Sequence, residues 1–430
     1  MSDTRPSIQL LLMRLDLDDK SPLHSHVDGQ NGGLRILEKD KHYQLLATVL
    51  DSSDRATSAP IACIDLSGSK REAYNYVLRS LRRILDRFYL PCCFVDLPET
   101  YTNDQQTIVN DEIARVGRGI YELFQTDPDN PVRAWLAKLL EPVSEITRDE
   151  RAFQPVTIIT NDFAIPWFWL KRERYGPFLC EVCPVGMQQL SAAAGRSEAH
   201  KSQPGRRDKS YEAVLVKGSS NLPFLDEELR HITATMSESS LVSYPSGRTE
   251  KYFDRAFTTR QVERRDDIPS LSRRLASKFR VVHFSGHYSG EELLLGGKPM
   301  PTNFLQHILK GSLLVLDGCS SASELDAWTD VESLTSTLIN EGALGCIVTV
   351  LPVKHDPIVG KVLWQKFYLD LRRGAGNVGE ALLNARLALR DHLNAIGSKN
   401  PAWLAYQLIG SPAVQFEDGE KLGGPDGKFD

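Results

Sequence analysis

From about residue 155 onward, short apolar runs rich in β-branched residues alternate with stretches of helical periodicity. The apolar runs are VTIIT (156–160), AVLVKG (213–218), RVVHFSG (280–286), LLVLDG (313–318) and GCIVTV (345–350). The helical stretches include Glu227–Met236, Asp267–Phe279, Asn303–Ile308, Val331–Asn340 and Asp356–Leu371. Repeated strand–helix alternation predicts an α/β fold, with a mostly parallel sheet flanked by helices on both faces. Burial of such strands on both sides explains their nearly continuous apolar character.

The first hundred residues mix strand and helix patterns instead of alternating them regularly. Residues 8–16 and 43–50 have the composition of strands, and residues 70–90 carry apolar side chains along one helical face. The end of the chain, EDGEKLGGPDGKFD, is polar and rich in glycine, which is typical of disorder. The predicted organisation is a mixed α/β accessory region over 1–104, a sheet domain over 105–416 and a disordered tail over 417–430.

Composition and charge exclude several classes of function. The chain has 41% hydrophobic and 25% charged residues and a formal net charge of −5, as in an ordinary soluble protein. This balance gives no electrostatic footprint for nucleic acid or for an anionic membrane. No apolar run approaches the roughly 18–20 residues that span a bilayer, and the amino terminus lacks a basic leader. We therefore expect a cytoplasmic protein, with no membrane and no direct nucleic-acid partner.

The cysteines do not form a recognisable framework. There are seven, and the closest useful pair is Cys180 and Cys183 in a lone CxxC. A zinc site would need a second CxxC or a histidine pair at ligand spacing, and neither follows, so we interpret these two as buried structural thiols. The sequence also contains no Walker loop and no dinucleotide fingerprint. We expect neither a metal nor a cofactor.

Two of the predicted strands run into chemically useful side chains. RVVHFSG leads to His287, and LLVLDG leads to Cys319. Reactive residues of parallel sheets gather at the carboxyl ends of strands, and a thiol near an imidazole can become a nucleophile. Glycine and serine residues around both positions suit tight turns and allow backbone N–H groups to approach an oxyanion. His283 lies inside its strand, and we interpret it as structural.

The order of several motifs resembles the CHAT domain, a caspase-like peptidase module related to separase and the other clan CD cysteine proteases. The motifs are TIITNDFAIPWFWL, PFLCEVCPVGM, LPFLDEELRHI, VVHFSGHYSG, LLVLDGCSSA, LINEGALGCIVTVLPVKHD, FYLDLRRG followed by GEALLNAR, and PAWLAYQLIGSP. The resemblance covers roughly residues 155–416. Each motif is weak alone, but their order and spacing together are specific.

The resemblance implies a role for each matching residue. His287 is the general base, Cys319 is the nucleophile, and backbone N–H groups near Tyr288 and at Cys319 form the oxyanion hole. One departure concerns the site, since the family usually has glycine where this chain has Tyr288, and the larger ring can restrict or gate the cleft. Residues 1–104 are either a degenerate pseudo-caspase half or a regulatory module.

The resemblance also implies a biological setting. It predicts limited proteolysis of a protein substrate, in prokaryotic defence or cell-death signalling. The chain shows no tetratricopeptide pattern, so we expect a separate activating or recruiting protein, or the accessory region itself, to bring in the substrate.

Asp317 indicates a preference for basic substrates. It lies two residues before Cys319, where metacaspases of the same clan carry an aspartate that lines the first specificity (S1) pocket. Side chains alternate along a strand, so residues 317 and 319 point the same way, and a carboxylate there would pair with Arg or Lys. Asp356 and Asp326 are lesser candidates for this pocket. The alternative is that Asp317 only hydrogen-bonds a turn.

Two further classes of function remain open. A catalytically silent caspase-like scaffold would use the fold for binding, with Tyr288 blocking the cleft. A small-molecule sensor would use the same crevice at the strand ends, and ligand would stabilise it without proteolysis.

Overall fold

The computed structural model describes twenty segments of the chain. They are residues 8–16, 43–51, 62–65, 68–84, 103–125, 131–141, 155–160, 165–189, 211–217, 225–237, 257–262, 280–286, 288–289, 292–295, 298–300, 311–317, 338–339, 342–351, 357–373 and 377–414. The predicted disordered tail lies outside these segments, as do the predicted helices at 267–279 and 303–308. Of the predicted helix at 331–340, only residues 338–339 are described, and they are helical.

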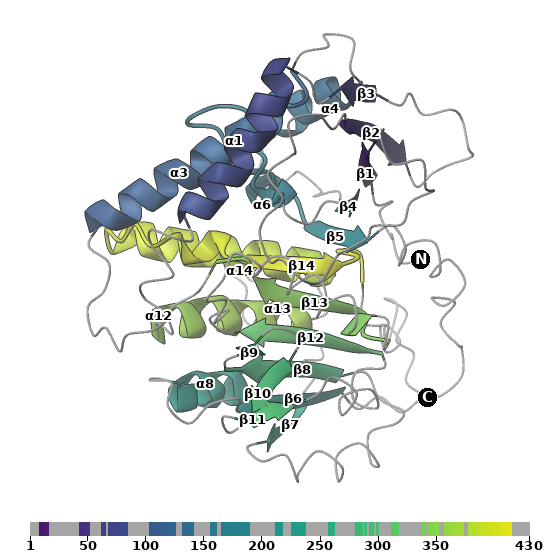
Figure 1. Cartoon of the computed structure of the whole chain (residues 1–430). Coiled ribbons are helices and arrows are strands. Elements are labelled where there is room, and N and C mark those ends of the chain that lie inside the picture. The colour runs from purple at the N-terminus through teal and green to yellow at the C-terminus, as the bar shows by residue number, and fades with distance from the viewer. Residues whose placement is uncertain are drawn as a thin grey trace, which may run out of the picture.

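The described strands form one eleven-stranded sheet and a small three-stranded sheet (Figure 1). The order of the large sheet is β3-β2-β1-β4-β5-β14-β13-β12-β8-β6-β7. Its strands are β1 (Ile8–Asp16), β2 (Tyr43–Asp51), β3 (Ala62–Asp65), β4 (Val156–Thr160), β5 (Val185–Gln189), β6 (Tyr211–Lys217), β7 (Phe257–Val262), β8 (Arg280–Ser285), β12 (Ser312–Asp317), β13 (Gly345–Thr349) and β14 (Tyr406–Gly410). The small sheet contains β9 (Tyr288–Ser289), β10 (Glu292–Leu295) and β11 (Lys298–Met300).

Most neighbouring strands of the large sheet are parallel. The exceptions among the described pairs are β1 with β2, β2 with β3, and β13 with β14. Every residue of β4, β12 and β13 is buried, as expected for strands covered on both faces. The predicted α/β class with a mostly parallel sheet is confirmed.

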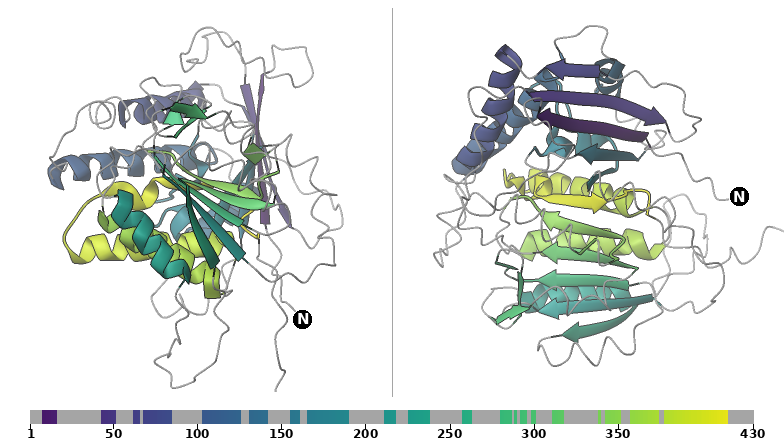
Figure 2. Two further views of the ribbon diagram at one scale, coloured as in Figure 1. Left: turned by 90° about the horizontal axis from the view of Figure 1, so that it is seen from below. Right: turned by 45° about the vertical axis from the view of Figure 1, so that its right-hand side comes forward.

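The described helices pack against this sheet and against one another. They are α1 (Gly68–Ile84), α3 (Asn103–Glu122), α4 (Pro131–Leu139), α6 (Leu179–Val182), α8 (Leu225–Ser237), α12 (Pro357–Val359), α13 (Gln365–Arg373) and α14 (Val378–Ala395). A π-helical turn at Gly360–Trp364 joins α12 to α13, and 3₁₀ turns lie at Trp167–Trp169 and Pro401–Leu404. Figure 2 shows α8, α13 and α14 together on one side of the sheet.

The amino-terminal strands belong to the same sheet as the rest of the chain. β1 pairs in parallel with β4, with Ile8 opposite Val156, and antiparallel with β2. The helix α1 also packs against α3, which begins at Asn103 and spans the predicted boundary between 104 and 105 (Figure 1). The accessory region is therefore continuous with the larger region through backbone hydrogen bonds, and the boundary stays a prediction.

Gly117 marks the closest approach of α3 to the following segment. The backbone N–H of Lys171 donates to the carbonyl oxygen of Gly117 at 3.1 Å. A Cβ atom at position 117 would lie 2.2 Å from the carbonyl oxygen of Trp169, which is rigid backbone. Only glycine allows this contact.

We predict that Gly117→Ala lowers the free energy of unfolding by roughly 1–3 kcal/mol, because either α3 or the Trp167–Trp169 turn must move. Gly176→Ala is the matched control, since a Cβ atom there meets its nearest neighbour at an ordinary 3.5 Å. Urea denaturation of both variants measures the difference. Equal stabilities would contradict the close approach.

Candidate active site

The strands that precede the two predicted catalytic residues are parallel neighbours. β8 pairs with β12, with Ser285 opposite Asp317, and the N–H of Gly286 donates to the carbonyl oxygen of Asp317 at 3.0 Å. His287 and Cys319 each follow two residues after this last pair. Both strands therefore lead to the same edge of the sheet, which is the condition that a Cys–His pairing requires.

The predicted site residues are only partly described. His287, Cys319, Asp326 and Asp356 lie outside the described residues, so their roles stay predictions. The backbone of Tyr288 begins β9 and pairs with Leu293 of β10. The residue after the predicted base is therefore part of the small three-stranded sheet.

On β8, the side chains of His283 and Ser285 face Glu228, a buried carboxylate on α8. His283 is fully buried; its Nδ1 lies 2.6 Å from the Tyr368 hydroxyl and its Nε2 lies 2.8 Å from Ser285 Oγ. The Ser285 hydroxyl donates to Glu228 Oε1 at 2.8 Å. Side chains at positions 283 and 285 share one face of the strand, so both reach the same helix layer.

These contacts fix the tautomer of His283. Because the Ser285 hydroxyl gives its proton to Glu228, its oxygen accepts a hydrogen bond from Nε2–H of His283. Nδ1 is then the acceptor for the Tyr368 hydroxyl. All donors thus point in one direction, from Tyr368 through His283 and Ser285 to Glu228.

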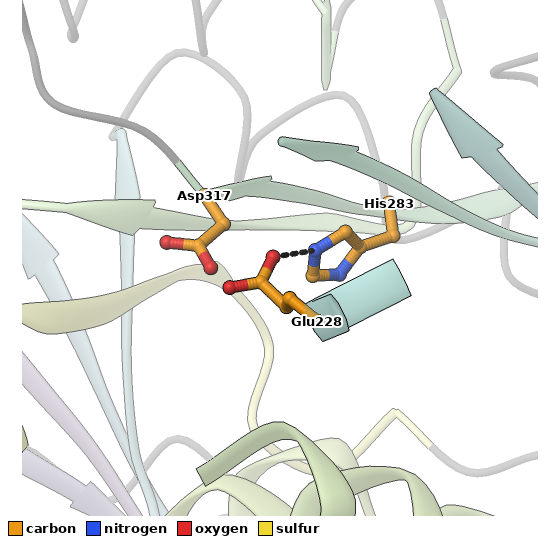
Figure 3. A group of neighbouring side chains, drawn as sticks. All are labelled: Glu228, His283 and Asp317. Carbon is orange, nitrogen blue, oxygen red and sulfur yellow. Dashed lines mark ion pairs between the residues drawn. The ribbon is translucent and has the colours of Figure 1, made fainter. Parts of the chain in front are cut away.

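His283 is neutral in this arrangement. Burial lowers the pKa of its imidazole to about 4, and the nearby Asp317 only partly offsets that effect. The 3.7 Å between His283 Nε2 and Glu228 Oε1, dashed in Figure 3, is bridged by the Ser285 hydroxyl. This contact is a relayed hydrogen bond and not a salt bridge.

Asp317, the last residue of β12, is 4% exposed and lies beside Glu228 (Figure 3). The Tyr406 hydroxyl donates to its Oδ1 at 2.9 Å, and the indole N–H of Trp364 donates to its Oδ2. Burial, together with the charge of Glu228, raises the pKa of the Asp317 carboxyl to about 7; His283, Trp364 and Tyr406 act in the opposite direction. Two buried carboxyl groups this close bind a proton that isolated ones would release.

The same three residues have the composition of a metal site. Ligand atoms of Glu228, His283 and Asp317 all lie within 4.8 Å of one another. Both ring nitrogens of His283 already take part in hydrogen bonds, so a cation that His283 ligates would have to displace Tyr368 or Ser285. We therefore interpret this cluster as a closed hydrogen-bonded network.

The π-helical turn at Gly360–Trp364 shapes the helix side of the network. A Cβ atom at position 360 would lie 2.6 Å from Glu228 Oε2, so the absence of a side chain at Gly360 lets the carboxylate approach. The Trp364 ring meets His283 edge-on at 5.0 Å and Tyr406 at 5.1 Å between ring centroids. Extra residues in a helical turn often occur at functional sites, and here the turn ends at Trp364 and lies one turn before Tyr368.

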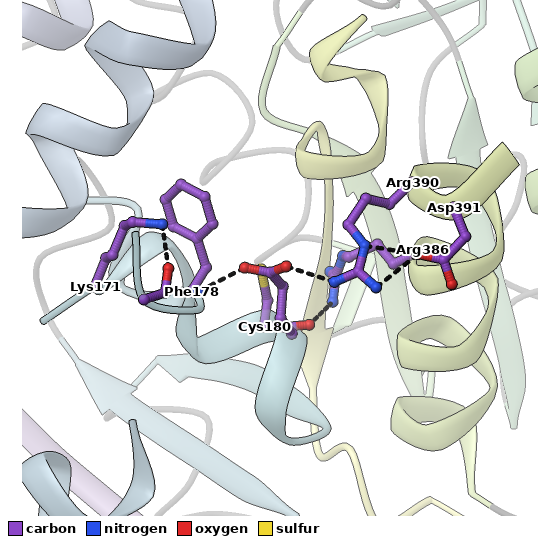
Figure 4. Close-up of polar contacts among 8 residues, drawn as sticks. Lys171, Phe178, Cys180, Arg386, Arg390 and Asp391 are labelled. Carbon is purple, nitrogen blue, oxygen red and sulfur yellow. Dashed lines mark hydrogen bonds and ion pairs between the residues drawn. The ribbon is translucent and has the colours of Figure 1, made fainter. Parts of the chain in front are cut away.

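A second buried group, the guanidinium of Arg386, connects Tyr406 to Cys180; Figure 4 shows Arg386 beside Cys180. Arg386 of α14 is buried and donates to the carbonyl oxygen of Tyr406 at 2.6 Å and to that of Cys180 at 3.5 Å. Cys180 and Cys183 are fully buried, as predicted for structural thiols. Burial raises the pKa of Cys180 to about 12 and that of Cys183 still further, so neither is a thiolate nucleophile.

His283 is internal to its strand, as the sequence predicted, but its partners were not identified from the sequence. Glu228 was detectable, because it falls at helical spacing between Leu225 and Ile232, which are buried. A carboxylate on an inward-facing position needs a partner. Tyr368, Trp364 and Tyr406 gave no such signal, since aromatic residues are ordinary in a core.

Comparison with known proteins gives a family match. The model of the CHAT domain matches residues 129–411. Two solved structures are similar, each at 11% sequence identity. "Crystal structure of the Arg specific cysteine proteinase gingipain R" has a TM-score of 0.42 and covers 65% of this chain and 70% of that one. "Structure of Protease" has a TM-score of 0.41, with coverages of 70% and 69%.

No curated protein matches the chain. Among the described residues, no helix combines the length and the apolar character needed to cross a membrane.

The network predicts a particular dependence of stability on pH. The folded-state pKa of Asp317 is raised from 3.8 to about 7, so its contribution to stability falls as pH rises through that window. The folded-state pKa of His283 is lowered from 6.5 to about 4, so its contribution rises with pH from about 4 to 6.5. The two contributions therefore oppose each other over most of this range.

We predict that Asp317→Asn removes the contribution of the Asp317 carboxyl to stability, which falls as pH rises. Relative to wild type, the variant should gain stability between pH 4 and 7, with a slope of at most about 1.4 kcal/mol per pH unit. Its amide can accept from Trp364 and donate to the Tyr406 oxygen, so the packing is retained. Denaturant unfolding at several pH values measures the slope, with Asp391→Asn, an exposed site, as control. A pH-independent difference would contradict the raised pKa.

Proposed function

Because this chain belongs to the CHAT domain family, we propose that it is a caspase-like cysteine endopeptidase that acts by limited proteolysis of a protein substrate. The observation that carries the proposal is the pairing of β8 with β12. Ser285 and Asp317 are partners in the sheet, and His287 and Cys319 each follow two residues later. This register supports a Cys–His dyad at the carboxyl edge.

In the proposed reaction, the imidazole of His287 takes the proton of Cys319, and the thiolate attacks the carbonyl carbon of the scissile bond. Backbone N–H groups of Tyr288 and Cys319 stabilise the oxyanion of the tetrahedral intermediate. The imidazolium then gives its proton to the leaving amine, and a thioester remains. Water, activated by the same imidazole, hydrolyses the thioester and releases the thiol.

We propose a preference for Arg or Lys before the scissile bond, with Asp317, Asp356 and Asp326 as the acidic groups of the S1 pocket. Asp317 already accepts two hydrogen bonds, and a carboxylate has room for further donors. A substrate guanidinium beside Asp317 would have to compete with the proton that the Asp317 carboxyl retains because of its raised pKa. Recognition of Arg through Asp317 should therefore strengthen as pH rises through about 7.

We place the protein in the cytoplasm, as an effector of prokaryotic defence or cell-death signalling that a partner protein activates. The family resemblance supports this setting. A silent scaffold is the alternative function, and Tyr288 in place of the usual glycine is the feature that favours it.

Labelling by an arginyl acyloxymethyl ketone tests the dyad. We expect wild type to form a covalent adduct at Cys319, and Cys319→Ala and His287→Ala to form none, because the thioether needs an activated thiolate. Intact-protein mass spectrometry with peptide mapping measures the adduct, with and without candidate partner proteins. Absence of the adduct in folded wild type under all conditions would favour the scaffold.

The specificity prediction compares two substrates that differ only in having Arg or Leu before the scissile bond. For wild type, the ratio of the two kcat/KM values should rise with pH around 7, and Asp317→Asn should lower that ratio at least tenfold. Asp326→Asn and Asp356→Asn measure the other two candidates. An unchanged ratio in Asp317→Asn would remove this residue from the S1 pocket.

A further inference from the structure

The network beneath the strand ends uses side chains from five elements of the fold. Glu228 lies on α8, His283 and Ser285 on β8, Asp317 on β12, Tyr368 and Trp364 on the helix that contains the π turn, and Tyr406 on β14. Side-chain hydrogen bonds connect these groups in two sets. One set runs from Tyr368 through His283 and Ser285 to Glu228. The other joins Trp364 and Tyr406 to Asp317, and the carboxylates of Glu228 and Asp317 lie next to each other. Most of these residues have no role in the proposed proteolytic reaction.

The two sets end on the residues that precede the predicted dyad. Ser285 is held through its hydroxyl by Glu228 and His283, and Asp317 is held through its carboxylate by Trp364 and Tyr406. One residue separates each of these from His287 or Cys319. Two extended residues span at most about 7 Å, so fixing Ser285 and Asp317 limits how far the Cα atoms of the predicted dyad can lie from these two residues.

We propose that Glu228, Ser285, His283 and Tyr368 form a relay that positions His287 relative to Cys319. The inference rests on the proposed function, because it concerns the same dyad. All four are positioning residues, since they act through the end of β8 and not on the substrate. Asp317, with its two donors, holds the partner strand in the same way.

The directionality of the relay makes this proposal specific. Tyr368 is the sole described donor to Nδ1 of His283, and that bond keeps the Nε2–H tautomer. Without it, the imidazole can carry its proton on Nδ1, and Nε2 can no longer donate to Ser285. The Ser285 hydroxyl would then turn toward His283, and its bond to Glu228 would be lost. A change at Tyr368 therefore reaches the strand end through hydrogen positions, with little change in volume.

Gly360 limits the alternatives for Glu228. The contact that a Cβ atom would make at 2.6 Å means that the carboxylate occupies the space left by this glycine. The position of α8 relative to the π turn is thus adjusted to bring Glu228 to Ser285. A carboxylate that served only to solubilise α8 would not need this space.

The test uses the reactivity of Cys319 toward iodoacetamide, measured against pH by peptide mapping in full-length protein. This readout needs neither substrate nor activator. If His287 is paired with Cys319, wild type and His287→Ala differ in their pH profiles, because the imidazole sets the thiolate fraction. The proposal expects Tyr368→Phe to shift the wild-type profile most of the way toward that of His287→Ala.

The matched control is Tyr121→Phe, which also removes a hydroxyl from a buried tyrosine but lies on α3, away from the network. It should keep the wild-type profile. Ser285→Ala breaks the relay at a second point, and the double variant Ser285→Ala/Tyr368→Phe should resemble the more affected single variant, because residues of one relay are not additive. Ser285→Ala also serves if Tyr368→Phe does not fold.

The outcomes separate the two proposals. Identical profiles for wild type and His287→Ala would overturn the dyad, and with it the proposed function. A difference between those two, with Tyr368→Phe and Ser285→Ala both equal to wild type, would overturn the relay alone. With a cleavable substrate, the relay variants should lose kcat about tenfold to a hundredfold with KM changed less than about twofold. An equal loss in Tyr121→Phe would identify a general packing effect and contradict the positioning role.

Discussion

Two carboxyl groups, Asp317 and Glu228, are buried between the sheet and its helices, and the surrounding structure follows from the free energy that this burial costs. An unpaired buried charge costs several kcal/mol, so each oxygen that is buried needs a donor. The donors come from Ser285, Trp364 and Tyr406, which lie on three different elements. Satisfying the carboxylates therefore fixes the relative positions of α8, β8, β12, β14 and the helix after the π turn.

Strand positions were predictable because the hydrophobic pattern alone determines them. The predicted runs at 156–160, 280–286 and 313–318 correspond to β4, β8 and β12 to within one or two residues. A strand buried on both faces must be apolar at nearly every position, and that signal is local in sequence. The sequence predicted the two strands that precede His287 and Cys319, but not that these strands are neighbours, which the pairing of β8 with β12 shows.

The network was not predictable, since it depends on side chains that are far apart in the sequence. His283 and Tyr368 are separated by 85 residues, and Asp317 and Tyr406 by 89. Nothing local distinguishes Tyr368 from the other aromatic residues of the core. Asp317 was singled out because of its distance from Cys319. The spacing of Glu228 in its helix signals an inward-facing carboxylate, but only the fold shows that Glu228 and Trp364 lie beside Asp317. The continuity of β1 with β4 is likewise a long-range property, because the sequence of a strand carries no mark of the strand beside it.

The strand β14 connects the hydrogen-bond network to the other half of the sheet. This strand is antiparallel to β13 on one side and parallel to β5 on the other. It therefore joins the part of the sheet that contains β8 and β12 to the part that contains β4 and the amino-terminal strands. Tyr406 begins β14; its hydroxyl holds Asp317 and its carbonyl oxygen accepts from the buried Arg386. Because a close-packed interior transmits small shifts, a displacement of β5 or α14 would reach Asp317 through Tyr406. A shift of β14 relative to its neighbours would therefore also move Asp317, at the end of the strand that precedes Cys319.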